Sequence, residues 1–201
     1  MKSDTKILLA VLGLTVAVMA IIIFTAGSTK PVDASLVNTG KNVRGPSETS
    51  NTLVEFSDFF CPSCKTAEPY VSQLLNKYPK KIKFIYRHFP LPQHPLAFKA
   101  STSAEAAGMQ GKFWEYKEKL FESQETLTEK SFSEIAKDLG LDLEKFNKDA
   151  SSEAALAAVQ ADLITSTKLN LSGTPSFFLN GEKINFSSFE SLNKTIESKL
   201  R

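Results

Sequence analysis

Two runs of β-branched and aromatic residues, Thr52–Ser57 and Ile82–Arg87, predict strands, and a helical pattern separates them. Between the runs, apolar residues recur with the spacing of one helix face, at positions 70, 71, 74, 75 and 78. Pro62 stands where this helix would begin, and proline is favoured there because the first helical N–H has no partner inside the helix. A strand, a helix and a second strand in this order indicate a right-handed βαβ unit.

From Leu96 to about residue 170 the pattern is helical throughout. Within this block, Ser131–Glu134 has the form of a capping box, and Gly140 stands where the helix that follows should end. We expect a longer helix over Ser152–Lys168. The block would be an insertion that folds back over the sheet.

The chain closes with the pattern of a β-hairpin followed by a helix. Ser176–Leu179 predicts a strand, Asn180-Gly181 is a typical two-residue hairpin turn, and Lys183–Phe186 predicts the return strand. A last helix is expected over Ser188–Lys199. Residues 52–201 therefore read as one α/β domain.

The first 24 residues follow a different pattern. Ile7–Phe24 contains 18 residues without a charge, and only Thr15 among them is neither apolar nor small. A helix of this length spans roughly 27 Å, close to the ~30 Å of a bilayer core. Lys2 and Lys6 precede it and predict that residues 1–6 remain in the cytoplasm.

We therefore expect a signal anchor at residues 7–24, with a single pass through the cell membrane and the rest of the chain on the extracytoplasmic side. Residues 25–51 are rich in Gly, Ser, Thr, Asn and Pro and are expected to form a flexible linker. The end of the linker, near Val43–Pro46, could add an edge strand. A cleaved signal peptide is the alternative, and the domain is exported in both cases.

The net charge and the number of cysteines limit which partners and which disulfide bonds the chain can have. With 24 basic and 22 acidic side chains the chain is nearly neutral, which argues against nucleic acid as a partner. Its two cysteines both lie in the segment Cys61-Pro62-Ser63-Cys64. No further disulfide can form within the chain, so the stability of the domain has to come from packing.

The position of this segment at the start of a helix predicts a redox pair. A thiolate there is stabilised by unpaired backbone N–H groups and by the positive end of the helix dipole, which lowers the thiol pKa. We expect Cys61 to be the nucleophile and Cys64, one turn later, to be the shielded resolving thiol. The pair is itself the redox centre, so no cofactor is expected.

Three segments resemble the DsbA-like disulfide oxidoreductases of the thioredoxin superfamily. They are Phe56–Cys64 with the cysteine pair, Phe89–Pro95 with Phe-Pro-Leu and His-Pro, and Gly173–Gly181 with Gly-Thr-Pro-Ser-Phe. The similarity covers about residues 43–201. It implies a thioredoxin-like α/β fold with a helical insertion at about residues 96–170, preceded in this chain by the transmembrane helix.

The resemblance also implies roles for particular residues. Pro175 would follow a cis peptide bond beside the cysteines, so that the backbone of Thr174 could pair with an extended substrate. A strand-initiating proline is the alternative. Glu55 would be a buried acid that relays a proton for Cys64, with Lys83 as a conceivable partner, against the alternative of a solvent-facing glutamate.

Pro62 and Ser63 lie between the two cysteines and would tune the acidity of Cys61. Strongly oxidising members of the family often carry a histidine where this chain has Ser63, so we expect Cys61 to be less acidic than in those members and the pair to be only moderately oxidising. Thr174 in place of an aliphatic residue points weakly the same way. Phe59 and Phe60 are either core residues or an apolar surface for unfolded clients.

Zinc binding is the main rival reading of the cysteine pair. Cys61 and Cys64 with His88 and His94 could supply four ligands. The two histidines, however, lie six positions apart at a proline-rich loop, so we expect no metal and a structural role for both. Trp114 is expected in the core of the helical block.

These observations predict an exported, membrane-anchored thiol–disulfide oxidoreductase that forms disulfide bonds in secreted or surface proteins with free thiols. The resemblance implies a membrane redox partner that reoxidises the cysteine pair. A reductase or isomerase of the same fold is an alternative. A non-catalytic peptide- or metal-binding module is another.

Overall fold

The computed structural model describes residue 12 and residues 34–200, and the chain divides into two compact units, residues 1–31 and 32–201. Apart from Leu12, the expected anchor at residues 7–24 lies outside the described residues. Over the part of the chain that is described, no helix has the length and apolar character needed to cross a membrane. The second unit contains both cysteines and the strands of the sheet.

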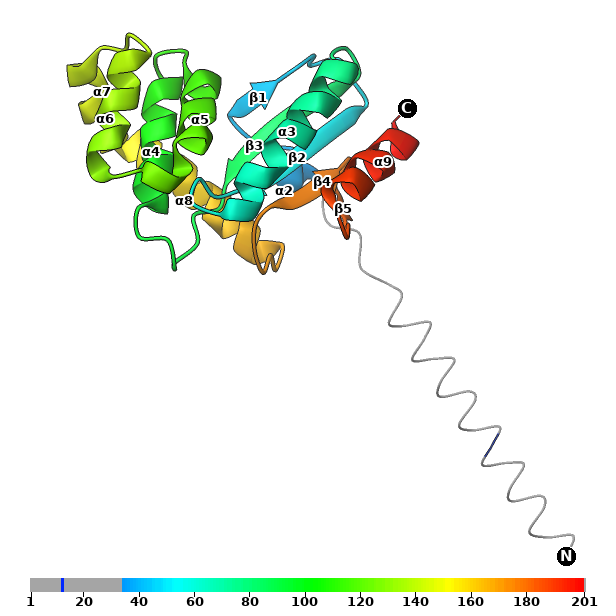
Figure 1. The fold of residues 1–201 in the computed structure, drawn as a ribbon. Coiled ribbons are helices and arrows are strands. Elements are labelled where there is room, and N and C mark those ends of the chain that lie inside the picture. Colours follow the sequence, from blue (N-terminus) through cyan, green and yellow to red (C-terminus); the bar gives the residue numbers. More distant parts are fainter. Residues whose placement is uncertain (1–11, 13–33, 201) are drawn as a thin grey trace, which may run out of the picture. The chain divides into compact units, whose positions relative to one another are not determined.

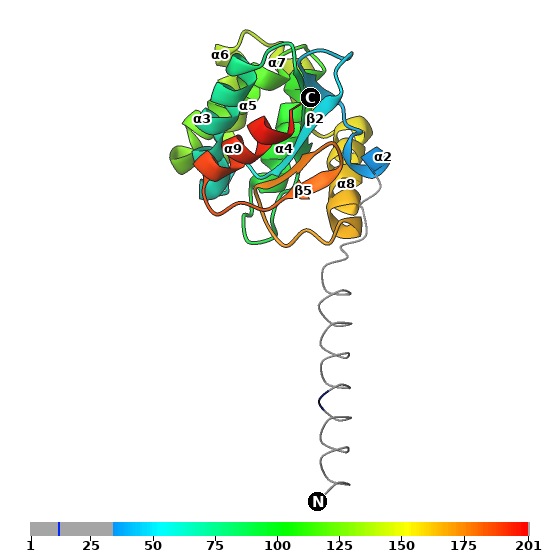
Figure 2. The same cartoon turned by 90° about the vertical axis from the view of Figure 1, so that its right-hand side faces the viewer.

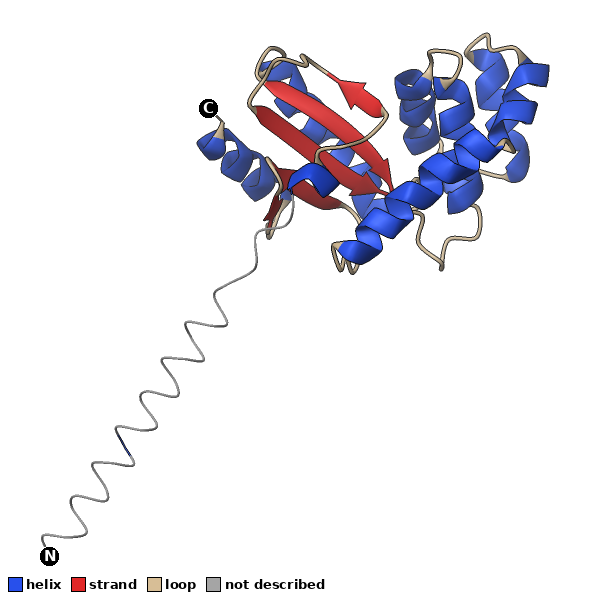
Figure 3. Cartoon of the chain, turned by 180° about the vertical axis from the view of Figure 1, so that it is seen from behind, coloured by secondary structure: helices blue, strands red, loops and turns tan. Residues whose placement is uncertain are grey.

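A five-stranded mixed sheet forms the centre of this unit (Figures 1 and 3). Its strand order is β1-β3-β2-β4-β5, in which β2 and β3 are parallel and the other neighbours are antiparallel. The predicted strands and hairpin are confirmed, with ends shifted by one or two residues. The bounds are β1 Asn42–Arg44, β2 Asn51–Ser57, β3 Ile82–His88, β4 Ser176–Leu179 and β5 Glu182–Ile184.

Helices cover both faces of the sheet. In Figures 2 and 3, α3 (Pro62–Lys77) and α9 (Phe189–Lys199) lie on one face, and α8 (Glu153–Lys168) and the short α2 (Ala34–Val37) lie on the other. Of the predicted insertion at about residues 96–170, the last helix is α8, which packs on β3. The part before α8 forms a block beside the sheet (Figure 1). Its elements are α4 Ala97–Gly108, α5 Phe113–Glu122, the 3-10 helix η1 Gln124–Thr126, α6 Glu129–Asp138 and α7 Leu143–Ala150.

Alternation along β2 decides which residues face the cysteines, since successive strand residues point to opposite faces. Val54 and Phe56 pack with Val37 in the core on the α2 side. Leu53 joins the larger core that includes α3 and the insertion. Glu55 and Ser57 alternate with Val54 and Phe56, so their side chains are directed toward α3 and the resolving cysteine.

Residues 34–44 correct the predicted linker, which was expected to continue to residue 51. Val37 is fully buried, β1 pairs with the edge of β3, and the Arg87 side chain donates a hydrogen bond of 2.7 Å to the Leu36 carbonyl oxygen. The expected edge strand is therefore present, as β1. A segment with a single buried valine has no hydrophobic period that could distinguish it from a linker.

The predicted capping box lies one turn too late. Helix α6 begins at Glu129, and the Thr128 N–H donates to the Ser131 hydroxyl oxygen at 3.0 Å, so Ser131 closes the box instead of opening it. The other predicted helix ends are confirmed, because Gly140 has a φ of +72° just beyond α6 and Ser152 caps α8. Asn180 and Gly181 have φ values of 54° and 83°, as a two-residue hairpin turn requires.

Candidate active site

The two cysteines occupy different environments at the start of α3. Cys61 is the N-terminal capping residue, with an extended backbone, and is 8% exposed. Its carbonyl oxygen accepts hydrogen bonds from the N–H groups of Cys64 and Lys65 at 3.0 and 3.2 Å. Cys64 lies one turn into the helix and is fully buried. The structure therefore places Cys61 toward solvent and Cys64 behind it.

This arrangement separates the acidities of the two thiols. The pKa of Cys61 is lowered to about 5, chiefly by a hydrogen bond from the Cys64 thiol and also by contacts with Thr174 and nearby backbone N–H groups, although burial opposes the change. The pKa of Cys64 is raised well above its usual value by burial, by the same thiol–thiolate hydrogen bond and by the charge of Glu55. At neutral pH Cys61 is a thiolate and Cys64 a thiol, which is the division that exchange requires.

The Thr174–Pro175 segment faces the nucleophile from the other side. The peptide bond between these residues is cis, as the resemblance predicted. The Thr174 carbonyl oxygen lies 3.5 Å from Cys61 Sγ. Residues 61 and 174 thus meet although 113 positions separate them in the chain.

Glu55 is a buried acid, and the solvent-facing alternative is wrong. The residue is 0% exposed, and neither carboxylate oxygen has a hydrogen-bond partner in the structure. Its pKa is raised from 4.5 to about 8, mainly by burial and further by the charge of Glu68, whereas the charge of Lys117 lowers it. Such a group can exchange a proton near neutral pH.

The cation near Glu55 comes from the insertion, so the conjecture about Lys83 is wrong. Lys83 pairs with Thr52 in the sheet, whereas Glu55 pairs with Tyr86. Lys117 of α5 forms an ion pair with Glu68 of α3, and its ammonium group lies over the ring of Tyr86 at 5.3 Å. The side chain of Lys117 is only 5% exposed.

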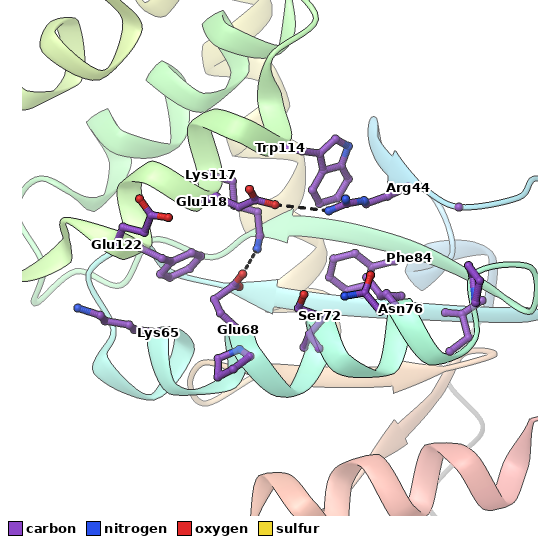
Figure 4. A pocket seen from close by; sticks show the side chains of 17 residues that line it. Arg44, Lys65, Glu68, Ser72, Asn76, Phe84, Trp114, Lys117, Glu118 and Glu122 are labelled. Atoms are coloured by element: carbon purple, nitrogen blue, oxygen red, sulfur yellow. Dashed lines mark hydrogen bonds and ion pairs between the residues drawn. The ribbon is translucent and has the colours of Figure 1, made fainter. Parts of the chain in front are cut away.

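Figure 4 shows Lys117 and Glu68 in a pocket of about 620 Å³ between α3 and α5. Trp114 also lines this pocket, so it is only partly buried, although its ring contacts Phe84 and Phe113. At one side of the pocket, Arg44 and Glu118 form an ion pair of 3.5 Å.

Gln124 is a site residue that sequence analysis missed. It lies in η1 of the insertion and is 8% exposed. Its side-chain amide donates hydrogen bonds to the carbonyl oxygens of Phe59 and Cys61, at 2.9 and 3.0 Å. The insertion therefore holds the turn that carries the nucleophile. A glutamine in a short polar segment gives no sequence signal for such a role.

The remaining predicted residues divide between surface and core. Pro62 and Ser63 are exposed beside Cys61, and Phe60 is half-buried against the main core. Phe59 is fully buried and its ring stacks on that of Tyr86, with 5.5 Å between centroids. Phe59 is therefore a core residue, and Phe60 alone could contribute apolar surface near the nucleophile.

Both histidines are engaged by carboxylates. His88 is buried with its Nε2 atom 2.9 Å from Glu105 Oε1, and His94 Nδ1 lies 2.7 Å from Asp58 Oδ2. Among the described residues, no group of three or more potential ligands is arranged to hold a metal ion. The ligand set of the zinc alternative is thus not assembled in this structure.

Comparison with known proteins agrees with the fold. The sequence profile of the family described as Thioredoxin matches residues 38–198. The chain belongs to the thioredoxin family. The match begins at residue 38 and so includes β1, in agreement with the shortened linker.

Three solved structures share the fold. Oxidised BdbD from Bacillus subtilis is 23% identical, with a TM-score of 0.70 over 84% of this chain and 95% of that one. The thiol–disulfide exchange protein alpha-DsbA2 from Wolbachia pipientis is 23% identical, with a TM-score of 0.69 over 78% and 86%. A thioredoxin-like oxidoreductase from Silicibacter pomeroyi is 27% identical, with a TM-score of 0.68 over 78% and 90%. The predicted thioredoxin-like fold with a helical insertion is confirmed.

Curated relatives have a different name and a much greater length. The Na(+)/H(+) antiporter NhaA 3 of Salinispora tropica is 38% identical over 143 residues, which are 71% of this chain and 22% of that protein. NhaA 1 of Salinispora arenicola is 39% identical over the same shares. The chain spans about a fifth of the length of these relatives. The word antiporter in their names therefore describes those longer proteins and not this chain.

Proposed function

We propose that this protein is an extracytoplasmic, membrane-anchored thiol–disulfide oxidoreductase that forms disulfide bonds in exported proteins. The observation that carries the proposal is the pairing of an acidic, solvent-side Cys61 with a buried Cys64 of raised pKa. A thiolate that is stable in the reduced form favours reduction of the enzyme's own disulfide, and therefore oxidation of a client.

The reaction begins with the disulfide between Cys61 and Cys64. A client thiolate attacks Cys61 Sγ, the Cys61–Cys64 bond breaks, and Cys64 leaves as a thiolate that takes up a proton. A second client thiolate then attacks the client sulfur of the mixed disulfide and releases the Cys61 thiolate. The low pKa of Cys61 makes it a good leaving group in this step. Two client thiols become one disulfide, and the two electrons stay on the enzyme until a membrane redox partner removes them.

Glu55 supplies the proton for Cys64 in this scheme. Its pKa of about 8 keeps it mostly protonated at neutral pH, and its charge is one of the causes that raise the pKa of Cys64. A protonated Glu55 therefore neutralises the departing thiolate without placing two negative charges in the core.

Client binding is assigned to the surface around Cys61. The backbone at Thr174 and Pro175 lies beside the nucleophile, and an extended client strand could pair with it. Phe60 adds apolar contact. Ser63 supplies no positive charge, so we propose an oxidase of moderate strength.

The direction of the reaction is tested by equilibrating the protein with glutathione and by determining the redox state of Cys61 and Cys64 in growing cells. An oxidase has a reduction potential well above that of thioredoxin, which is about −270 mV, and its cysteines are found oxidised. A reductase or isomerase would be found reduced, and that result would contradict the proposal.

Catalysis is tested separately by Cys64→Ser, which should accumulate mixed disulfides between Cys61 and exported proteins. Cys61→Ser is the matched control and should accumulate none. A non-catalytic binding module would give no mixed disulfides with either variant. Labelling of Cys61 in intact cells by a membrane-impermeant thiol reagent, after an equally impermeant reductant has opened the disulfide, tests the proposed location. Protection from the reagent under these conditions would contradict it.

A further inference from the structure

Asp58 is a buried carboxylate between β2 and the nucleophile, and the scheme above does not use it. Its side chain is 0% exposed. Oδ1 accepts a hydrogen bond from the Phe60 N–H at 2.7 Å. Oδ2 lies 2.8 Å from the Leu91 N–H and 2.7 Å from His94 Nδ1, which donates because a carboxylate accepts. Three donors therefore fix the orientation of this side chain.

The backbone of Asp58 contacts both cysteines. Its N–H points at Cys64 Sγ, with 3.5 Å between nitrogen and sulfur. Its carbonyl oxygen accepts the Cys61 N–H at 3.1 Å. The peptide group before Asp58 therefore directs a hydrogen-bond donor at Cys64 Sγ, and the peptide group after it anchors the backbone of Cys61.

The loop that supplies two of the three donors is the Phe89–Pro95 segment, a motif that the redox scheme leaves without a role. Its three prolines restrict the backbone, and the Phe89 N–H donates to the Ser57 carbonyl oxygen at 2.8 Å. The His94 side chain is 22% exposed and closes the loop onto Asp58. The loop thus holds the Asp58 side chain from outside the active-site helix.

We propose that Asp58 and His94 are positioning residues for the exchange reaction, which aim the Asp58 N–H at Cys64 Sγ. This donor stabilises the sulfur of Cys64 as it leaves with a negative charge. In the reduced protein the Cys64 thiol donates its hydrogen to the Cys61 thiolate, which makes the Cys64 sulfur a better acceptor for this N–H than a sulfur in a disulfide. Without His94, Oδ2 keeps a single donor, the carboxylate turns, and the peptide that carries the N–H turns with it. The reduced state then loses stability relative to the disulfide.

The expected size follows from the loss of about one hydrogen bond to a buried sulfur, which is about 1 kcal/mol or about fivefold in the equilibrium constant. The inference rests on redox chemistry at Cys61 and Cys64, as proposed above, but not on its direction. Equilibration with glutathione therefore measures it whether the protein works as an oxidase or as a reductase.

The test compares His94→Leu with His94→Asn in the full-length protein. Asparagine places a side-chain N–H close to the position of Nδ1, whereas leucine places none there. We expect His94→Leu to shift the glutathione equilibrium about fivefold toward the disulfide form, and His94→Asn to stay within about twofold of the wild type. If the glutathione equilibrium of His94→Leu were unshifted, His94 would have a structural role only, whether or not the free energy of unfolding changes. That result would overturn the inference. Equal shifts in both variants would also overturn it.

Asp58→Asn provides a second measurement if His94→Leu does not fold. The asparagine side chain has the same shape, but one of its two oxygens is replaced by an NH2 group. This group cannot accept a hydrogen bond from the donor that faces it. The equilibrium should shift in the same direction and by at least about fivefold. An unchanged equilibrium would overturn this inference while the proposed function stands. If the wild type itself formed no disulfide with glutathione, both would fall.

Discussion

Replacing Glu55 by glutamine removes a buried titrating group whose effect on stability can be calculated from the structure. Burial and the charge of Glu68 raise its pKa from 4.5 to about 8. In the unfolded chain the same carboxyl ionises near its ordinary value of 4.5. Between these two pH values the folded protein holds one more proton than the unfolded chain. The stability from this group is fully present below pH 4.5 and is lost as pH rises through 8.

Each pKa unit corresponds to 1.36 kcal/mol, so the free energy of unfolding loses about 1.4 kcal/mol per pH unit through Glu55, and about 5 kcal/mol over the whole range. Glutamine does not titrate, and Glu55→Gln abolishes this loss. Cys61 in the reduced protein titrates in the opposite sense, since its pKa is lowered from 9.0 to about 5. The difference between wild type and variant therefore isolates Glu55, whereas neither curve alone does.

Urea unfolding of the reduced protein, at pH values from below 4.5 to above 8, measures this difference. Trp114 is the only tryptophan and packs against Phe84 and Phe113, so its fluorescence reports loss of the fold. Glu118→Gln, at an exposed ion pair, is the matched control and should follow the wild-type slope. If the difference in unfolding free energy between wild type and Glu55→Gln stayed constant with pH, Glu55 would not have a raised pKa in the folded protein.

Three further substitutions test the surroundings of the cysteines. Lys117→Met removes the cation that lowers the pKa of Glu55, so the same urea series should give a pKa of Glu55 above about 8. An unchanged pKa would exclude Lys117 as the partner of Glu55. Gln124→Leu removes the side-chain donor of the Phe59 carbonyl oxygen and one of three donors to the Cys61 carbonyl oxygen. It should lower the free energy of unfolding by about 1–3 kcal/mol, with no loss expected if water replaces the amide. Ser63→His adds positive charge beside Cys61, so its pKa should fall and the glutathione equilibrium should shift toward the reduced enzyme by about tenfold for each pKa unit; no shift would argue against charge as the tuning factor.

The strands and the start of α3 could be predicted because their signals are local. β2 and β3 are rich in β-branched and aromatic residues, and Pro62 directly after Cys61 marks the helix start. Glu55 was conspicuous because it is the one acid within an otherwise apolar strand. The cis bond before Pro175 came from the family resemblance alone, since the residues themselves are compatible with a trans bond.

The features that could not be predicted depend on contacts across long stretches of chain. Lys117 and Gln124 reach the active site only because the insertion folds back onto α3, and nothing near either residue indicates where that contact falls. α2 and β1 gain their stability from β3 and its neighbours, so their own residues resemble a linker. The capping box was misplaced by one turn because both Thr128 and Ser131 can cap a helix.

The proposed chemistry requires that the fold hold Cys61 as a thiolate at neutral pH, with Cys64 protonated behind it. Titration of the reduced protein, followed by the ultraviolet absorbance of the thiolate, measures this most directly, and Cys61→Ser identifies which sulfur contributes. We predict a midpoint at a pH of about 5 that is absent from Cys61→Ser. A midpoint near the ordinary thiol value of 9.0 would contradict it.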